Sequence, residues 1–461
     1  MIYAVGFFVV YLLHVLLKLD WEMTLVVLLF AALVLPFHQK LYRQSKENQR
    51  RFFEVSLYLD TILYAFVKEE KVDLAVRDVS MTMPEGTLKT LTENALEYMN
   101  MTFDEVEVVE EALKMIENEY PCQRIKDVHQ FMTLVEYYGG EIEKPVNLLL
   151  ADKGRWEQRI KHTIAERNKQ MVDVILSVAA SLVICGAMVY LPIGGMDISK
   201  ELVVQICAVA VIMVDDFIIY RAQRYLKVDW IQLQLTEDEE YYAKKVEKFL
   251  QYDEKKERKL SYLLGGMGCV LTIAAFVIKK EWLVAAMLGL TLFFFQQHKV
   301  GRRIEKRNLV KEIKYAFPNW LLDLVLLLQS ESVQVALQKS REHVPGVLRK
   351  ELFLLTEQLE MEPESSVPYH LFLQEFAIPE VHSAMGILYS ISIGDSGNAD
   401  KQISELVEKN LELLDEAERE LLRNASSGMY GLFLLPVVVA SFKLIVDMIY
   451  MMLYFVQIPM V

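Results

Sequence analysis

Long apolar runs alternate with stretches as charged as a soluble surface, and this alternation restricts the architectures open to the chain. Of the 461 residues, 53% are hydrophobic and 24% are charged. A helix that spans a bilayer needs about 20 mostly apolar residues. The sequence therefore predicts an all-α, polytopic membrane protein with about seven transmembrane helices, at 2–18, 23–38, 171–193, 201–220, 261–278, 281–297 and about 428–449.

Basic residues gather beside several of these segments, and their positions predict the orientation of the chain. Lys and Arg follow the second segment at 40–51 and the sixth at 299–307, and they precede the third at 153–169. Short loops rich in these residues stay in the cytoplasm. We therefore expect a multi-pass protein of the cytoplasmic (inner) membrane with a cytoplasmic amino terminus. The last run is expected to cross once, with the tail from Tyr450 returning along the outer interface.

Apolar residues recur at helical spacing in both large polar regions, and strand signals are scarce. We expect these stripes to belong to two small all-helical bundles, one in each region. The stripes are Phe53, Leu57, Thr61, Tyr64 and Ala65, then Leu88, Leu91, Ala95 and Met99, and in the second region Leu321, Leu324, Val325 and Leu328. The expected domains are a hairpin (1–38), a first cytoplasmic bundle (39–170), two spans (171–220), a charged connector (221–260), a second hairpin (261–297), a second cytoplasmic bundle (298–427) and a C-terminal membrane segment (428–461).

The two bundles resemble each other, which indicates an internal repeat. Residues 57–76, LYLDTILYAFVKEEKVDLAV, parallel residues 319–337, NWLLDLVLLLQSESVQVAL. Residues 128–152 parallel 381–409 in the same way: each begins at Val-His, breaks at glycines and resumes as a long charged helix. The repeated unit is a membrane hairpin, a cytoplasmic bundle and a span.

This order resembles the type II secretion system F domain, with the clearer match in the second copy. The residues that fit the family pattern are Phe317-Pro318, Leu322-Asp323, Ala336-Leu337 and Gly394 to Gly397. The resemblance implies a non-enzymatic inner-membrane platform for a Tad-type or type IV pilus or a type II secretion pseudopilus. It also implies a cytoplasmic secretion ATPase, pilin or pseudopilin subunits and further platform proteins as partners, and two F-type domains in one chain.

The stretch Gly394-Asp395-Ser396-Gly397 spells the sequence around the nucleophilic serine of trypsin-like proteases. A nucleophilic serine needs a histidine base and a carboxylate that orients it. The histidines are scattered, so we interpret this stretch as a helix–helix turn, in which Gly394 can end one helix in a left-handed cap. Its counterpart in the first copy is Gly139-Gly140. The turn motif thus comprises Gly139, Gly140, Gly394, Ser396 and Gly397.

Charged residues inside the apolar runs are candidate functional groups, because a carboxylate at mid-membrane costs about 2.5 to 3.5 kcal/mol. Asp215 and Asp216 lie near the predicted cytoplasmic end of the fourth segment. We interpret both aspartates as packing or anchoring residues, and a proton or ion relay is the alternative function. Lys443 and Asp447 stand four apart, so they can neutralise each other on one helix face.

An acidic stretch in the first bundle is either a solvated helix face or a docking face for a basic partner. The candidate docking residues are Asp104, Glu105, Glu107, Glu110 and Glu111. The net charge of −14 argues against binding of nucleic acid. The sequence contains neither GxxxxGK[ST] nor HExxH, and it indicates no cofactor or metal site.

Two functions from other classes stay open. A transporter would place polar residues together near mid-membrane, usually beside broken helices. A membrane-bound serine hydrolase would use Ser396, and labelling by a fluorophosphonate that Ser396→Ala abolishes would support it.

Overall fold

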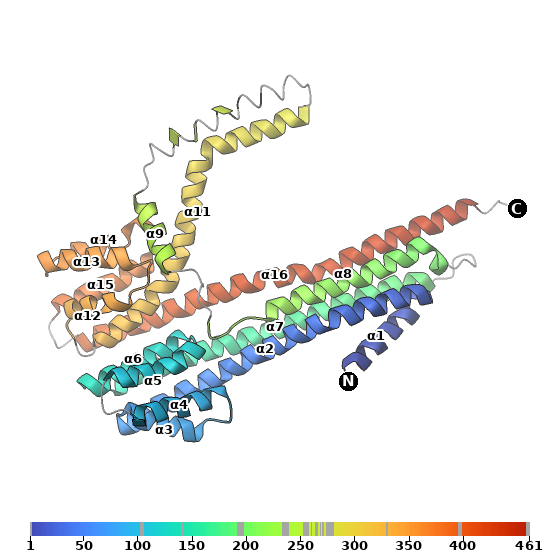
Figure 1. The fold of residues 1–461 in the computed structure, drawn as a ribbon. Coiled ribbons are helices and arrows are strands. Elements are labelled where there is room, and N and C mark those ends of the chain that lie inside the picture. The colour runs from blue at the N-terminus through green and yellow to red at the C-terminus, as the bar shows by residue number, and fades with distance from the viewer. Residues whose placement is uncertain are drawn as a thin grey trace. The chain divides into compact units, whose positions relative to one another are not determined.

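The computed structural model describes residues 2–101, 106–139, 142–190, 198–232, 239–251, 281–328, 331–394 and 399–457, together with scattered residues between 258 and 272. Helices make up 89% of the structure, and the described residues form no strand. Figure 1 shows that several of these helices are very long. The predicted all-α class is therefore confirmed.

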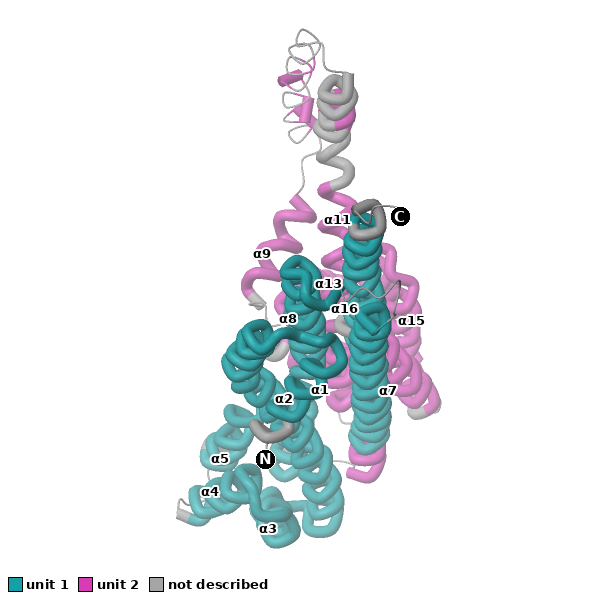
Figure 2. Tube along the Cα trace, turned by 90° about the vertical axis from the view of Figure 1, so that its right-hand side faces the viewer, with its two compact units in different colours: residues 1–137, 149–233, 419–461 teal, residues 138–148, 234–418 magenta. Residues whose placement is uncertain are grey.

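The chain divides into two units, which Figure 2 colours separately. Unit 1 contains residues 1–137, 149–233 and 419–461, and unit 2 contains residues 138–148 and 234–418. Unit 1 thus combines the first predicted bundle with the predicted spans on both sides of it and the C-terminal segment. Unit 2 contains most of the second predicted bundle.

In the described part of the chain, four helices are long and apolar enough to cross a membrane. They are α2 (Trp21–Glu69), α7 (Glu143–Tyr190), α8 (Leu202–Leu226) and the Lys401–Leu453 part of α16 (Ala399–Gln457), and each covers all or most of one predicted span. Helix α1 (Ile2–Leu17) is apolar but shorter. The predicted span at 261–278 lies largely outside the described residues.

The apolar parts of α1, α2, α7, α8 and α16 pack around a shared core in unit 1, which we term the apolar assembly. Its buried residues include Leu13 of α1, Val27 of α2, Cys185 of α7, Ile212 of α8 and Ala440 of α16. Many of the remaining apolar side chains on these helices are exposed. An exposed apolar rim around an apolar core is what a lipid environment requires.

Close helix packing in this assembly depends on a small residue in α7. A Cβ atom on Gly186 would lie 2.7 Å from the carbonyl oxygen of Leu16 in α1. No side chain fits at that distance, so glycine at this position permits α1 to approach α7.

Gln205 of α8 holds the turn between α1 and α2. Its side-chain amide donates to the carbonyl oxygens of Lys18 (2.9 Å) and Ser199, and its oxygen accepts from the backbone N–H of Asp20 (3.1 Å). Three backbone groups outside the helical hydrogen-bond ladders thereby find partners. At this end of the assembly, α8 begins just after the 3₁₀ helix η1 (Ile198–Lys200).

Helices α2 and α7 run without interruption from the apolar assembly into the first bundle. Residues 39–51 of α2 are mostly Gln, Lys, Arg and Glu, which favour helix. No glycine or proline lies between Pro36 and Glu69 to stop the helix. The predicted boundaries at 38 and 170 therefore fall inside single helices.

The first bundle adds α3 (Val72–Thr82), α4 (Thr87–Met101), α5 (Val106–Glu119) and α6 (Gln123–Tyr138) to the ends of α2 and α7. Of the positions selected in α2, Ala65 is buried, whereas Phe53, Leu57 and Tyr64 are each at least 41% exposed. The other buried apolar residues in this part of α2 include Phe52, Val55, Leu59, Ile62 and Phe66. Helix α2 has apolar residues on two faces, and the packing of Phe52 against Trp156 of α7 selects one of them.

Unit 2 contains α9 (Glu239–Leu250), α11 (Glu281–Leu327), α12 (Val333–Lys339), η2 (Ser340–His343), α13 (Arg349–Met361), α14 (Val367–Leu371), η3 (Gln374–Phe376), α15 (Pro379–Ile393) and the start of α16. The predicted stripe of Leu321, Leu324, Val325 and Leu328 is buried. Trp320 stacks on Phe372, with ring centres 5.8 Å apart.

Pro318 lies inside α11. Two local expectations need correction. Gly394 follows α15 with φ −76° and ψ 150°, which is extended and not left-handed. Glycine is needed there because a Cβ would lie 2.8 Å from the carbonyl oxygen of Ser390. Helix α16 continues to Gln457, so the chain does not turn back at Tyr450, where the sequence offers no glycine or proline.

Candidate functional site

Three of the charged residues selected from the sequence are buried in the apolar assembly around Cys185 of α7. Asp215 of α8 and both Lys443 and Asp447 of α16 lie near enough for their charges to act on the Cys185 thiol. None of these four residues is more than 2% exposed. With Ser181, one helical turn before Cys185, they form what we term the charged cluster.

Lys443 and Asp447 form an ion pair along one face of α16. Their spacing of four residues places both side chains on adjacent turns, as the sequence predicts. The pair is neutral as a whole, which reduces the cost of burying it. The second carboxylate oxygen of Asp447, Oδ1, is buried without a hydrogen-bond partner among the described residues.

Asp215 has a different environment from Asp447. Its Oδ2 accepts a hydrogen bond from the hydroxyl of Ser181 at 3.2 Å, and its Oδ1 is buried without a partner in the described part of the chain. Helix α8 extends to Leu226, eleven residues beyond Asp215. Asp215 is therefore farther from the helix end than the sequence suggests, and it does not reach solvent.

Asp216 belongs to a separate, partly exposed group. Its Oδ1 lies 3.3 Å from Nε2 of His38 on α2, and the other ring nitrogen of His38 lies 2.7 Å from the side-chain oxygen of Gln223. Asp216 is therefore paired with another helix, as an anchoring role requires. The two adjacent aspartates have different partners because successive residues point to different faces of a helix.

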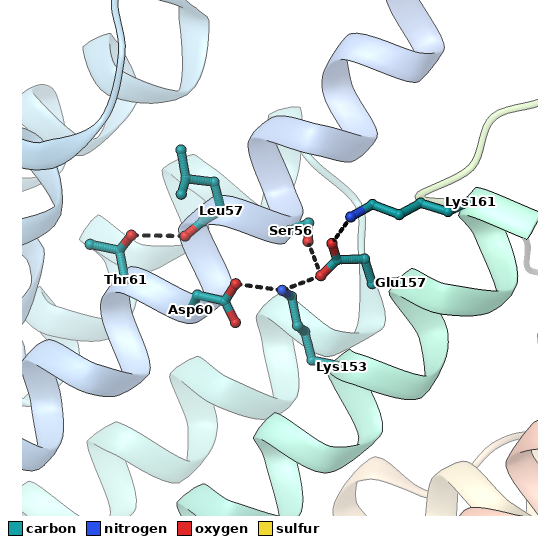
Figure 3. Close-up of polar contacts among 7 residues, drawn as sticks. All are labelled: Ser56, Leu57, Asp60, Thr61, Lys153, Glu157 and Lys161. Carbon is teal, nitrogen blue, oxygen red and sulfur yellow. Dashed lines mark hydrogen bonds and ion pairs between the residues drawn. The ribbon is translucent and has the colours of Figure 1, made fainter.

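A second polar site joins α2 to α7 in the first bundle (Figure 3). The ammonium of Lys153 on α7 donates to Asp60 of α2 and to Glu157, one turn further along α7. Glu157 also accepts from Ser56 of α2 at 2.9 Å and from Lys161. We term these five residues the α2–α7 network.

The α2–α7 network holds Glu157 in its charged form. Burial alone would raise the pKa of Glu157, but hydrogen bonds from Lys153, Lys161 and Ser56 outweigh that effect and lower the pKa to about 2. Lys153 is itself buried, and the two carboxylates that it contacts offset the cost of burying its ammonium. The network thus fixes the pairing of two helices that continue into the apolar assembly.

The first bundle also contains a buried hydroxyl–imidazole–carboxylate chain. The hydroxyl of Tyr58 lies 2.7 Å from Nε2 of His129, and Nδ1 of His129 lies 2.8 Å from Glu117. Burial first, and then the charge of Glu117, raise the pKa of Tyr58. Tyr58 is fully buried, so no substrate reaches its oxygen, and the chain links α2, α5 and α6.

The other predicted site residues are only partly described. Gly139 ends α6 with φ +69°, the left-handed conformation expected of a glycine turn, while Gly140, Ser396 and Gly397 lie outside the described residues. Asp104 and Glu105 also lie outside them, and the side chain of Glu107 is not described. Glu110 pairs with Lys114 at 3.7 Å, and Glu111 accepts from Tyr98 at 2.6 Å.

Sequence reasoning missed Ser181, Cys185 and the α2–α7 network. Serine and cysteine are small enough to occur in any apolar helix. Neither residue therefore indicates, from the sequence, that a charged residue such as Asp215 or Lys443 lies nearby. The signal for the network was the Leu59-Asp60 pair, since an aspartate within an otherwise buried helical stretch needs a partner. Its partner lies 93 residues away.

Comparison of the chain with protein-family models, with curated proteins and with solved structures yields no match.

Proposed function

We propose that the chain is an inner-membrane platform protein for a Tad-like or type IV-like pilus or a type II secretion pseudopilus. In this role it couples a cytoplasmic secretion ATPase to the extraction and polymerisation of pilin subunits, and it catalyses no reaction itself. It works in the cytoplasmic membrane with other copies or with related platform proteins.

The observation that carries the proposal is the recurrent order of the helices. A long helix leads into each bundle (α2 or α11), short helices follow (α3 to α6, or α12 to α15), and a long helix leads out again (α7 or α16). The helices α2, α7 and α16 each combine a polar bundle segment with an apolar segment of membrane-spanning length. A continuous helix of this kind is suited to transmit force between a soluble motor and the membrane.

The proposal includes the finer topology that the sequence predicts. Seven segments cross the membrane, the amino terminus is cytoplasmic, and both bundles lie in the cytoplasm. The basic flanks at 40–51, 153–169 and 299–307 support this orientation. Cysteine substitutions in α4 and at residues 194–197 can be tested with a membrane-impermeant thiol reagent in intact cells. The proposed topology predicts that the reagent labels the cysteine at 194–197 and leaves the cysteine in α4 unlabelled.

The acidic part of α5 is the proposed docking face for the ATPase. Glu110 is half exposed, with 51% of its side chain accessible, and Asp104, Glu105, Glu107 and Glu111 lie beside it in the sequence. A negative face steers a basic partner toward it, and salt weakens the attraction.

Co-purification tests the platform proposal. The detergent-solubilised protein is expected to retain a Walker-type ATPase encoded beside it. Deletion of 311–427 should abolish this retention if the second bundle is required, and Glu110→Lys should weaken it in a salt-dependent way. Glu85→Lys is the matched control, because the side chain of Glu85, two residues before α4, is 90% exposed. An ATPase that binds neither the intact protein nor any variant would contradict the proposal.

A transporter is the second candidate, and the charged cluster is the observation that favours it. Buried charges within membrane segments often mark ion or substrate pathways. However, α7, α8 and α16 are continuous helices at the cluster, whereas transporter sites are usually built from broken ones. Proteoliposomes that contain this protein and no ATPase can be assayed for ion flux. A flux that Asp215→Asn abolishes would favour transport.

A further inference from the structure

Asp215 is a carboxyl group in the apolar assembly, and no described residue forms an ion pair with it. It is 1% exposed and lies on α8 among the buried apolar residues Val211, Ile212 and Ile218. Its recorded polar contact is the hydroxyl of Ser181, which donates to Oδ2. Oδ1 is buried and has no hydrogen-bond partner among the described residues.

The titratable and charged groups around Asp215 come from three helices. Helix α7 contributes the Cys185 thiol, and α16 contributes Lys443 and Asp447. Helix α2 contributes His38, which lies 3.3 Å from Asp216, the neighbour of Asp215 on α8. Lys443 is already neutralised by Asp447 in an ion pair on its own helix. None of these groups therefore compensates a negative charge on Asp215.

A buried carboxyl without a cation is expected to take up a proton, because the neutral form avoids the cost of removing a charge from water. The hydrogen bond from Ser181 by itself favours the charged carboxylate, whereas the burial of Asp215 favours the neutral form. Oδ2 acts as the acceptor for Ser181, and the unpartnered Oδ1 is free to carry the hydrogen. A divalent metal ion fits poorly, because calcium and magnesium take six or more oxygen ligands. No group of three His, Cys, Asp or Glu residues able to hold a metal occurs in the described part of the chain.

We propose that Asp215 is an intramembrane proton-binding site, occupied while α7, α8 and α16 pack as in this structure. The proton is bound by the carboxyl oxygen Oδ1, and the hydroxyl of Ser181 orients the group. Release requires water or a base to reach Asp215, so it requires these helices to separate locally. Asp216, the next residue on α8, is partly exposed and pairs with His38 of α2.

The site therefore makes the packing of α8 against α7 and α16 dependent on proton binding. This inference is independent of the platform proposal: a protein that binds no ATPase can still hold a proton at Asp215, and a platform protein can lack one.

Carbodiimide labelling tests the inference on the full-length protein in lipid nanodiscs. Dicyclohexylcarbodiimide partitions into lipid and reacts with protonated carboxyl groups, and peptide mass spectrometry identifies the modified residue. Labelling of Asp215 is expected near neutral pH, with a fall of about tenfold per pH unit on the alkaline side. Asp447, held in its ion pair with Lys443, is expected to stay unlabelled.

Asp215→Asn removes the carboxyl group that the carbodiimide is expected to label, so this label should disappear. Asp216→Asn is the matched control at the neighbouring position. Infrared spectroscopy gives a second readout, since the carbonyl band of a protonated carboxyl should vanish in Asp215→Asn and persist in Asp216→Asn. The wild-type labelling pattern stands by itself if a variant fails to fold. Absence of both the label and the band near neutral pH would overturn the proposal. Protection by sodium at constant pH would also overturn it and would indicate a monovalent cation as the occupant.

Discussion

The ammonium nitrogen of Lys153 on α7 lies 2.5 Å from Oδ2 of Asp60 on α2. The two residues are 93 positions apart in the chain, and the contact joins two helices that both continue into the apolar assembly. Lys153 is almost fully buried, whereas Asp60 keeps 39% of its side chain exposed. The contact therefore lies at the edge of the bundle core. If one of the two charges is removed, water there can only partly compensate the charge that remains.

We expect Lys153→Met to destabilise the first bundle by roughly 1 to 3 kcal/mol, because it leaves Asp60 and Glu157 without their shared donor. Lys161→Met is the matched control, since Lys161 contacts the same Glu157 but has 52% of its side chain exposed. That variant should lose less than about 1 kcal/mol. Thermal unfolding of the detergent-solubilised protein compares them, and equal losses would contradict the importance of the buried lysine.

We expect the folded protein to lose stability in acid as Glu157 becomes protonated. Its pKa is lowered to about 2 in the folded protein, against about 4.3 for an unperturbed glutamate. Its contribution is therefore fully present above the unfolded value and is lost as the pH falls toward the folded value. The melting temperature should fall between about pH 4.3 and pH 2, and Glu157→Gln should flatten that part of the profile. An unchanged profile in Glu157→Gln would contradict this account.

Two glycines of α7 should respond in opposite ways to alanine. A Cβ at Gly186 would meet the carbonyl oxygen of Leu16 at 2.7 Å, so Gly186→Ala must push α1 away and destabilise the protein. A Cβ at Gly154 meets nothing within 4 Å, and Gly154→Ala should stabilise the helix by up to about 1 kcal/mol. Thermal unfolding of both variants checks the signs. Crosslinking of cysteines placed in α1 and α7 should decrease only in Gly186→Ala.

The buried chain of Tyr58, His129 and Glu117 should behave as a coupled unit. Tyr58→Phe removes one hydrogen bond and should cost about 1 kcal/mol. His129→Ala also leaves the hydroxyl of Tyr58 buried without a partner and should cost about 1 to 3 kcal/mol more. The double variant should therefore lose less than the sum of the two single variants. Strict additivity in urea unfolding would show that the hydroxyl is satisfied in another way.

Ser396 should not act as a nucleophile if the Gly394 to Gly397 stretch is a turn. We expect a fluorophosphonate to label the wild-type protein and Ser396→Ala equally weakly. Strong labelling that the substitution removes would support the hydrolase alternative. Trypsin provides the positive control for reagent activity.

Apolar run length and helical periodicity determined much of the architecture without any tertiary information. Apolar runs of about 20 residues predicted the apolar parts of α2, α7, α8 and α16. A backbone in lipid must satisfy its hydrogen bonds internally, and a helix does so within a single segment. The buried stripe around Leu321 was also readable, since apolar residues occupy one face there. In α2 the same method chose Phe53 and Leu57, because that helix is apolar on two faces and its sequence alone cannot rank them.

Only the tertiary structure decided which polar groups meet. Asp215 of α8 and Lys443 of α16 are separated by 228 positions, and no local pattern indicates that both lie near Cys185 of α7 or that Ser181 of α7 donates to Asp215. The same holds for Lys153 and Asp60. Periodicity reports the face on which a residue lies, whereas the partner of a buried charge depends on how helices from distant parts of the chain pack. For that reason the sequence predicted charged candidates in the membrane, and the packing distinguished the paired Lys443 and Asp447 from the unpaired Asp215.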